Sequence, residues 1–148
     1  MGRPSPAERA FLERRRVAHL ATADPTGRPH VVPVCFVLGD GVVYIVLDLK
    51  PKRGEPGRLK RVRNILANPR AALVADVYDD ADWSRLGFVL VTGPARLLTE
   101  GIEHARALAL LRGRYQQYRA MPLEDRPVIA LGLEHVASWG ALDERPAG

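Results

Sequence analysis

The stretch Pro29–Asp48, PHVVPVCFVLGDGVVYIVLD, says most about the architecture of this chain. Two valine-rich runs, Pro29–Leu38 and Val42–Asp48, flank the tight turn Gly39-Asp40-Gly41. Valine favours extended strands and glycine favours tight turns, so the stretch predicts an antiparallel hairpin. Pro33 has no backbone N–H to donate, which predicts that the first strand is an edge or carries a bulge at that position.

The same patterns predict further elements on both sides of the hairpin. Ser5-Pro6-Ala7-Glu8 has the composition of a helix start with a capping box, which indicates a helix over about residues 5–16. An apolar stripe that begins at Leu59 predicts a second helix, which Asn68-Pro69 ends. A third helix is expected over 102–118, with His104 on its surface, and further strands are expected over 17–22, 71–77, 88–98 and 128–136. Gly93-Pro94 predicts a bulge or kink within the strand over 88–98.

The order of these elements predicts the fold class. Strands follow one another more often than they alternate with helices, which favours a mainly β, α+β fold with a closed antiparallel sheet. No linker is long enough to divide the chain, so residues 1–148 are expected to form one domain. The tail over 141–148 is expected to be flexible.

Composition excludes several classes of protein. Nearly half of the 148 residues are apolar, which is enough for a real core. A single cysteine, Cys35, excludes an internal disulfide and a cysteine-based zinc site, and the histidines show no metal-binding spacing. The apolar runs are too short to cross a bilayer, and the N-terminus lacks the apolar region of a signal peptide. We therefore expect a soluble, cytoplasmic protein without a bound metal.

Positive charge is concentrated between positions 50 and 63. This segment holds seven Lys or Arg residues and one Glu, a net charge of +6, whereas the whole chain carries +5. A flexible loop followed by a helix start is suited to bind phosphate, because helix N-terminal amides and Lys or Arg side chains favour anions. A solvated helix face and a nucleic-acid contact are the alternatives. The absence of interleaved aromatic residues argues against nucleic acid.

The sequence offers no obvious reacting group. None of the three serines lies in a nucleophile elbow, and no pair of carboxylates stands out as an acid and base. This absence favours chemistry carried by a bound cofactor. Trp83-Ser84 follows an acidic turn, and a Trp in a turn can lie over a planar ligand, although packing in the core is the more common role.

The order and spacing of several short motifs resemble the pyridoxamine 5′-phosphate oxidase-like split-barrel family, over about positions 8 to 140. A second set of motifs is similar to an F420-dependent subgroup of that family. The first set is Leu20-Ala21-Thr22, Gly27–Val34, Val43-Tyr44-Ile45, Asn68-Pro69-Arg70 and Gly93–Leu97. The second set is Lys50–Arg53, Arg61–Ile65, Asp76–Ser84 and Arg114–Tyr118.

The resemblance implies a six-stranded split barrel that forms a homodimer, with FMN or the deazaflavin F420 in a groove at the subunit interface. It implies that the cofactor ring lies along Pro33 and Val34 and along Leu47 and Asp48, and that Trp83 and Ser84 lie near it. The phosphate would be held by cations of the basic segment. Counting from Tyr44 favours Lys50 and Lys52, and counting from Asn68 favours Lys60 and Arg61; the remaining candidates are Arg53 and Arg58.

The charge of the basic segment bears on the choice of cofactor. FMN ends in one phosphate, whereas F420 continues into a polyglutamate tail, and seven cations suit an extended anion. The expected activity is therefore F420-dependent, two-electron hydride transfer to a small planar or unsaturated substrate. The alternatives are an FMN-dependent oxidoreductase of the same fold and a non-enzymatic protein that binds flavin or haem. The C-terminal motif that clamps substrate in pyridoxamine phosphate oxidase is not evident, so that specific activity is not expected.

Overall fold

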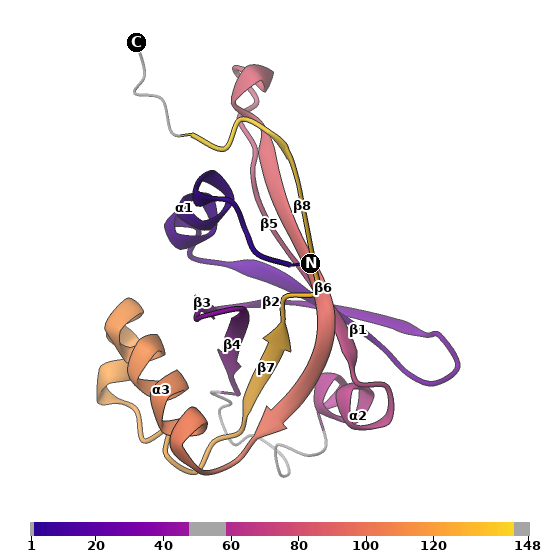
Figure 1. Cartoon of the computed structure of the whole chain (residues 1–148), viewed down its shortest axis with the longest axis vertical. Helices are drawn as coiled ribbons and strands as arrows, with labels where there is room; N and C mark the ends of the chain where they lie inside the picture. The colour runs from indigo at the N-terminus through magenta and orange to yellow at the C-terminus, as the bar shows by residue number, and fades with distance from the viewer. Residues whose placement is uncertain (1, 48–58, 144–148) are drawn as a thin grey trace.

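The computed structural model describes residues 2–47 and 59–143, and over these ranges the chain is a mainly β, α+β protein (Figure 1). Its strands are β1 (Ala18–Ala23), β2 (Pro29–Val34), β3 (Val37–Leu38), β4 (Val42–Val46), β5 (Arg70–Val77), β6 (Gly87–Leu98), β7 (Val128–Gly132) and β8 (His135–Gly140). Its helices are α1 (Pro6–Arg14), α2 (Lys60–Ala67) and α3 (Ile102–Arg114), with the short 3₁₀ helices η2 (Trp83–Arg85) and η3 (Gln116–Ala120).

All pairings between the described strands are antiparallel, in the order β2-β1-β5-β6-β7-β4-β3, with β8 on β6. Pro33 lies on β2, at one end of this order, where a residue without an N–H is tolerated. The order ends at β2 and at β3, so pairing among the described residues leaves the sheet open. Eight described strands also exceed the expected six, and a closed six-stranded barrel stays a prediction.

Strand β6 belongs to both halves of the sheet. Its first part, Gly87–Thr92, pairs with β8, and its last part, Ala95–Leu98, pairs with β7. Gly93 lies at the change of partner, where a Cβ atom would come within 1.9 Å of the carbonyl oxygen of Gly132. Only glycine fits this close approach of two backbones, which explains the irregularity expected at Gly93-Pro94.

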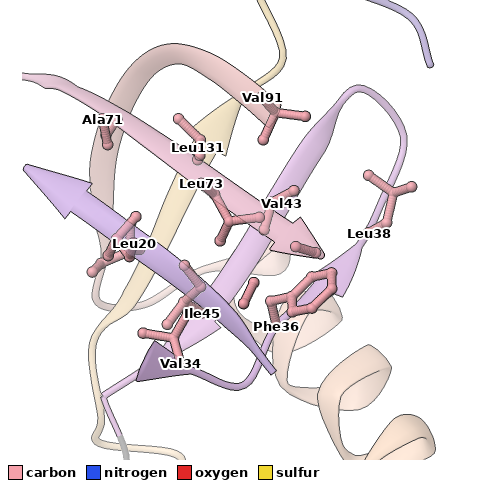
Figure 2. Packing of buried hydrophobic residues seen from close by; sticks show 14 of the residues in the cluster. Leu20, Val34, Phe36, Leu38, Val43, Ile45, Ala71, Leu73, Val91 and Leu131 are labelled. Carbon is pink, nitrogen blue, oxygen red and sulfur yellow. The ribbon is translucent and has the colours of Figure 1, made fainter. Parts of the chain in front are cut away.

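Two hydrophobic cores lie on opposite faces of β4. The main core, which is shared by the sheet interior, α1 and α2, includes Leu20, Val34, Ile45, Leu73 and Leu131 (Figure 2). The second core lies between α3, η3 and the outer face of β4 and β7, and it includes Tyr44, Val46, Leu108, Leu111 and Val128. Both faces of β4 are therefore covered, which accounts for its continuous apolar run.

Helix α1 begins as its sequence predicts and ends against a distant arginine. The Ser5 hydroxyl accepts from the N–H of Glu8 at 3.1 Å, and the Glu8 carboxylate accepts from the N–H of Ser5 at 2.8 Å, so the capping box is confirmed. At the other end, the Arg114 guanidinium donates to the carbonyl oxygens of Leu12, Glu13 and Arg15. The Leu12 carbonyl also accepts from the N–H of Arg15 at 3.1 Å, and Arg114 adds donors at the C-terminal end of α1, where the last carbonyls of a helix lack helical partners.

Four expectations about the elements are wrong in detail. The strand expected over 29–38 breaks after Val34, and the strand expected over 128–136 is β7 followed by β8. The helix expected over 102–118 ends at Arg114, because Tyr115 adopts an extended conformation, and the chain continues as η3. His104 is buried rather than on the surface, and its Nε2 lies 2.7 Å from the carbonyl oxygen of Arg126.

No helix in the described ranges combines the length and the apolar character required to cross a bilayer.

Candidate cofactor site

A pocket of about 200 Å³ lies where the end of β2, strand β4 and the first turn of α2 meet. Strand β2 contributes Pro33 and Val34, β4 contributes Ile45 and Val46, and α2 contributes Arg61. Val17, Cys35 and Tyr118 complete the described lining. The walls are therefore largely apolar, with one permanently charged guanidinium, which is an arrangement suited to a flat apolar group that carries an anionic substituent.

Hydrogen bonds to β1 fix the position of α2 beside this pocket. Buried Asn64 donates from Nδ2 to the hydroxyl of Thr22 at 3.0 Å, and Asn68 donates to the carbonyl oxygen of Ala23 at 3.3 Å. Val62 and Ile65, which lie on the same helix, are buried in the main core. The helix therefore presents its first turn, including Arg61, to the end of β2.

Lys60 and Arg61 are neighbours in sequence but have different surroundings. Arg61 lines the pocket, whereas the Nζ of Lys60 lies 3.8 Å from Oδ2 of Asp24 in the turn between β1 and β2. The side-chain hydrogen bond from Thr26 to Asp24, together with backbone N–H donors of that turn and the charge of Lys60, lowers the pKa of Asp24 to about 2. Asp24 therefore stays ionised at physiological pH and holds the Lys60 ammonium near the turn.

The remaining residues expected at the cofactor are distributed over several places. Pro33, Val34 and Arg61 are brought together in the pocket. The side chain of Leu47 is fully buried in the main core and is not among the pocket-lining residues. Five expected residues lie outside the described ranges and stay predictions: Asp48, Lys50, Lys52, Arg53 and Arg58.

Trp83 and Ser84 lie on η2, at the tip of an arm formed by β5, β6 and β8 that extends away from α2 (Figure 1). Asp82 caps this turn by accepting from the N–H of Ser84 at 3.0 Å and from its hydroxyl at 2.6 Å, and these bonds lower the pKa of Asp82. The indole of Trp83 donates to the Tyr78 hydroxyl at 3.3 Å, yet the residue is 69% exposed. Neither Trp83 nor Ser84 is among the described residues that line the pocket of the same chain.

Sequence reasoning missed part of the pocket wall. Val17, Cys35, Ile45, Val46 and Tyr118 line the pocket without having been expected there. For Cys35 a local signal existed, since it directly follows Pro33 and Val34. Tyr118 had no such signal, because it reaches the pocket only through the end of α3 at Arg114 and the turn into η3.

Comparison with known proteins gives a family match and several matches of fold. The model of the family described as pyridoxamine 5′-phosphate oxidase matches residues 5–140. A search of curated proteins gave no match.

Three solved structures illustrate the match of fold. Conserved hypothetical protein Rv2991 from Mycobacterium tuberculosis has a TM-score of 0.73 at 21% identity, over 94% of this chain and 86% of that chain. A haem-binding protein from Mycobacterium smegmatis has a TM-score of 0.71 at 24% identity, over 95% of this chain and 56% of that chain. An F420 reductase has a TM-score of 0.63 at 23% identity, over 91% of this chain and 98% of that chain. At these identities the likeness shows the fold.

Proposed function

This chain belongs to the pyridoxamine 5′-phosphate oxidase family, and from that premise we propose that it is an oxidoreductase that uses the deazaflavin F420. The proposed reaction is two-electron hydride transfer to a small planar or unsaturated substrate. Membership of the family supports a flavin-type cofactor. The pocket between β2, β4 and α2 is the single observation that carries the proposal.

The pocket fits one part of such a cofactor. Pro33 and Val34 offer an apolar strand end for a ring, and Arg61 offers a guanidinium for a phosphate or carboxylate. A volume of about 200 Å³ is below the ~300–1,000 Å³ that is usual for small-molecule sites. The rest of the binding surface must therefore come from elsewhere, and a second subunit and the basic segment over 50–58 are the proposed sources.

The charge of the basic segment supports F420 over FMN. Lys60 is held near Asp24, which leaves Arg61 as the described cation of the segment that lines the pocket. The other cations of the segment are available in the sequence for an anion longer than one phosphate, and the polyglutamate tail of F420 is such an anion. An F420 reductase with the same fold is consistent with this choice.

The cofactor would supply the hydride chemistry when bound. The described pocket residues would orient and shield it: Pro33 and Val34 by contact with the ring, and Arg61 by pairing with an anionic group. Apolar walls exclude water, which strengthens the interaction of a guanidinium with an anion. The chain would then contribute positioning and electrostatics rather than a covalent step.

A parallel titration of the purified protein with F420 and FMN, followed by the fluorescence of each cofactor, tests the proposal. We expect F420 to bind more tightly than FMN at moderate salt. Arg61→Gln should weaken F420 binding by roughly ten- to a hundredfold, because a hydrogen bond to a charged group contributes about 1.5–3 kcal/mol. Oxidation of reduced F420 with a panel of unsaturated substrates would then establish turnover.

The matched control is Arg28→Gln, which removes an exposed arginine that does not line the pocket. Its F420 affinity should equal that of the wild type. Tighter binding of FMN would replace F420 by FMN in the proposal. If neither cofactor bound and added haem gave a Soret band, the chain would be a haem binder, as the structural neighbour from Mycobacterium smegmatis is named.

A further inference from the structure

A second and larger hollow lies over the outer face of β4. It is a groove of about 830 Å³ between the outer face of the sheet and one side of α3. Its volume lies within the range of small-molecule sites. It shares no lining residue with the candidate cofactor site.

The polar centre of the groove is a carboxylate, that of Glu103, which accepts hydrogen bonds from two donors. Glu103 accepts at Oε2 from the Tyr44 hydroxyl at 2.8 Å and from Arg96 at 2.7 Å. The bond from Arg96, the bond from Tyr44 and the nearby charges of Arg96 and Arg106 lower the pKa of Glu103, and burial together with Glu103 raises the pKa of Tyr44 to about 12. The charge of Glu103 is thus already balanced by Arg96 within the protein.

Arg106 is a further cation beside the Arg96–Glu103 ion pair. It lines the groove and lies close enough to act on Glu103 and Tyr44, but it forms no ion pair with any residue in the described ranges. Asp40 also lines the groove, but it is exposed on the turn between β3 and β4 and forms no ion pair with Arg106 in the described ranges. The anion-attracting point of the groove is therefore the guanidinium of Arg106.

Aliphatic side chains lie one helical turn to each side of this guanidinium. Ile102 is 82% exposed and Leu110 is 37% exposed, and both line the groove from the same side of α3 as Arg106. Pro94 on β6 adds apolar surface to the lining of the groove. Exposed apolar side chains that border a cavity around one charged group are typical of a site for an amphipathic anion.

We propose that this groove binds a small aliphatic carboxylate, with its carboxylate group on Arg106 and its chain against Ile102 and Leu110. The site is separate from the proposed cofactor site and would exist without any cofactor. The ligand would be recognised by its charge at Arg106 and by apolar contact with the side chains along α3.

Backbone amide NMR of the full chain, titrated with octanoate in the absence of cofactor, tests this proposal. Saturable shift changes are expected at Tyr44, Arg96, Ile102 and Arg106. Arg106→Gln should raise the Kd for octanoate about tenfold, which is the loss of one charge-assisted interaction. Octan-1-ol, which has the same chain without the charge, should bind the wild type at least tenfold more weakly than octanoate.

Two further variants keep the result decisive. Ile102→Glu places a negative charge on the wall at an exposed position, where the fold tolerates it, and it should abolish octanoate binding. Arg28→Gln removes an exposed arginine outside the groove and should leave the Kd unchanged. The proposal is overturned by equal binding of octanoate and octan-1-ol, by an unchanged Kd in Arg106→Gln, or by shifts centred on Val34 and Arg61. These readouts are independent of F420, so they do not depend on the proposed function.

Discussion

Hydrogen bonds from single hydroxyl and guanidinium groups stabilise the points where strands and helices end, and the local sequence does not predict these bonds. The Tyr115 hydroxyl accepts from the N–H of Phe36 at 3.0 Å and lies 2.9 Å from its carbonyl oxygen and 2.8 Å from that of Arg16, to one of which it donates. The strand that begins at Pro29 thus breaks where a residue 79 positions later supplies its hydrogen bonds. By contrast, the capping box of Ser5 and Glu8 was predictable, because its partners are three residues apart.

Removal of the Tyr115 hydroxyl should destabilise the fold. Tyr115→Phe leaves the N–H of Phe36, whose side chain is fully buried, without its partner, and an unsatisfied buried donor costs about 1–3 kcal/mol. We expect the free energy of unfolding, measured by urea denaturation, to fall by that amount.

Tyr78→Phe is the matched control for this change. Its hydroxyl donates to Asp80 at 2.9 Å, but the residue is 59% exposed and water can replace the lost bond. The free energy of unfolding of this variant should stay within about 0.5 kcal/mol of the wild type. Equal losses in both variants would show that Tyr115 does not fix the break at Phe36.

Strand β6 is the element that joins the halves of the sheet, and its change of partner depends on Gly93. The sequence predicted this strand and an irregularity at Gly93-Pro94, because both signals are local. It did not predict that β7 and β8 are separate strands, since their separation follows from the close approach of Gly132 to Gly93. Contacts between residues so far apart in sequence leave no periodic pattern.

Gly93→Ala should destabilise the protein strongly. The new Cβ would come within 1.9 Å of a backbone oxygen that cannot move without disturbing β7. We expect a loss of about 3 kcal/mol in the free energy of unfolding, at the upper end of what overpacking costs. Thermal and urea unfolding should both show the loss.

The control for Gly93 is Gly113→Ala on α3. A Cβ atom there meets no atom within 4 Å, and the residue is exposed within a helix. Alanine is favoured over glycine in a helix by about 1 kcal/mol, so this variant should be slightly more stable than the wild type. A similar loss in both variants would count against the role assigned to the Gly93–Gly132 contact.

The molecule as a whole has two projecting parts that a single chain leaves uncovered. The hairpin of β1 and β2 extends to one side, and the arm of β5, β6 and β8 extends away from α2 and α3 (Figure 1). Large apolar side chains are exposed on both, among them Val31 at 65%, Trp83 at 69% and Trp139 at 57%. Such exposure is typical of a surface that is buried in an assembly.

We expect these surfaces to be buried in a homodimer, as proposed for the complete cofactor site. Val31→Glu combined with Trp139→Glu should convert the dimer to monomer, because charges would be buried without partners. Light scattering coupled to size-exclusion chromatography measures the mass directly. The control, Ile102→Glu on α3, replaces an even more exposed apolar residue away from the arm and should stay dimeric. A wild-type chain that is monomeric at micromolar concentration would contradict the expectation.

For the molecule as a whole, the sequence predicted the class of fold better than it predicted the candidate cofactor site. Local periodicity and turn residues predicted the antiparallel, mainly β architecture. Pro33, Val34 and Arg61 line one pocket, whereas Leu47 lies in the main core, and the contact of these residues with a cofactor stays a prediction. Trp83 lies on η2 and is not among the described residues that line that pocket in the same chain, and no pattern within one chain indicates which residues a second copy would supply.

The sharing of β6 between both halves of the sheet also affects how the molecule unfolds. Each half takes one of its pairing surfaces from the same continuous backbone, so neither half can open fully without exposing the hydrogen-bonding edge of the other. The two cores are therefore coupled in stability although they lie on opposite faces of β4. The chain should behave as one cooperative folding unit, and a fragment that carries only one of its two halves would lack a complete hydrophobic interior.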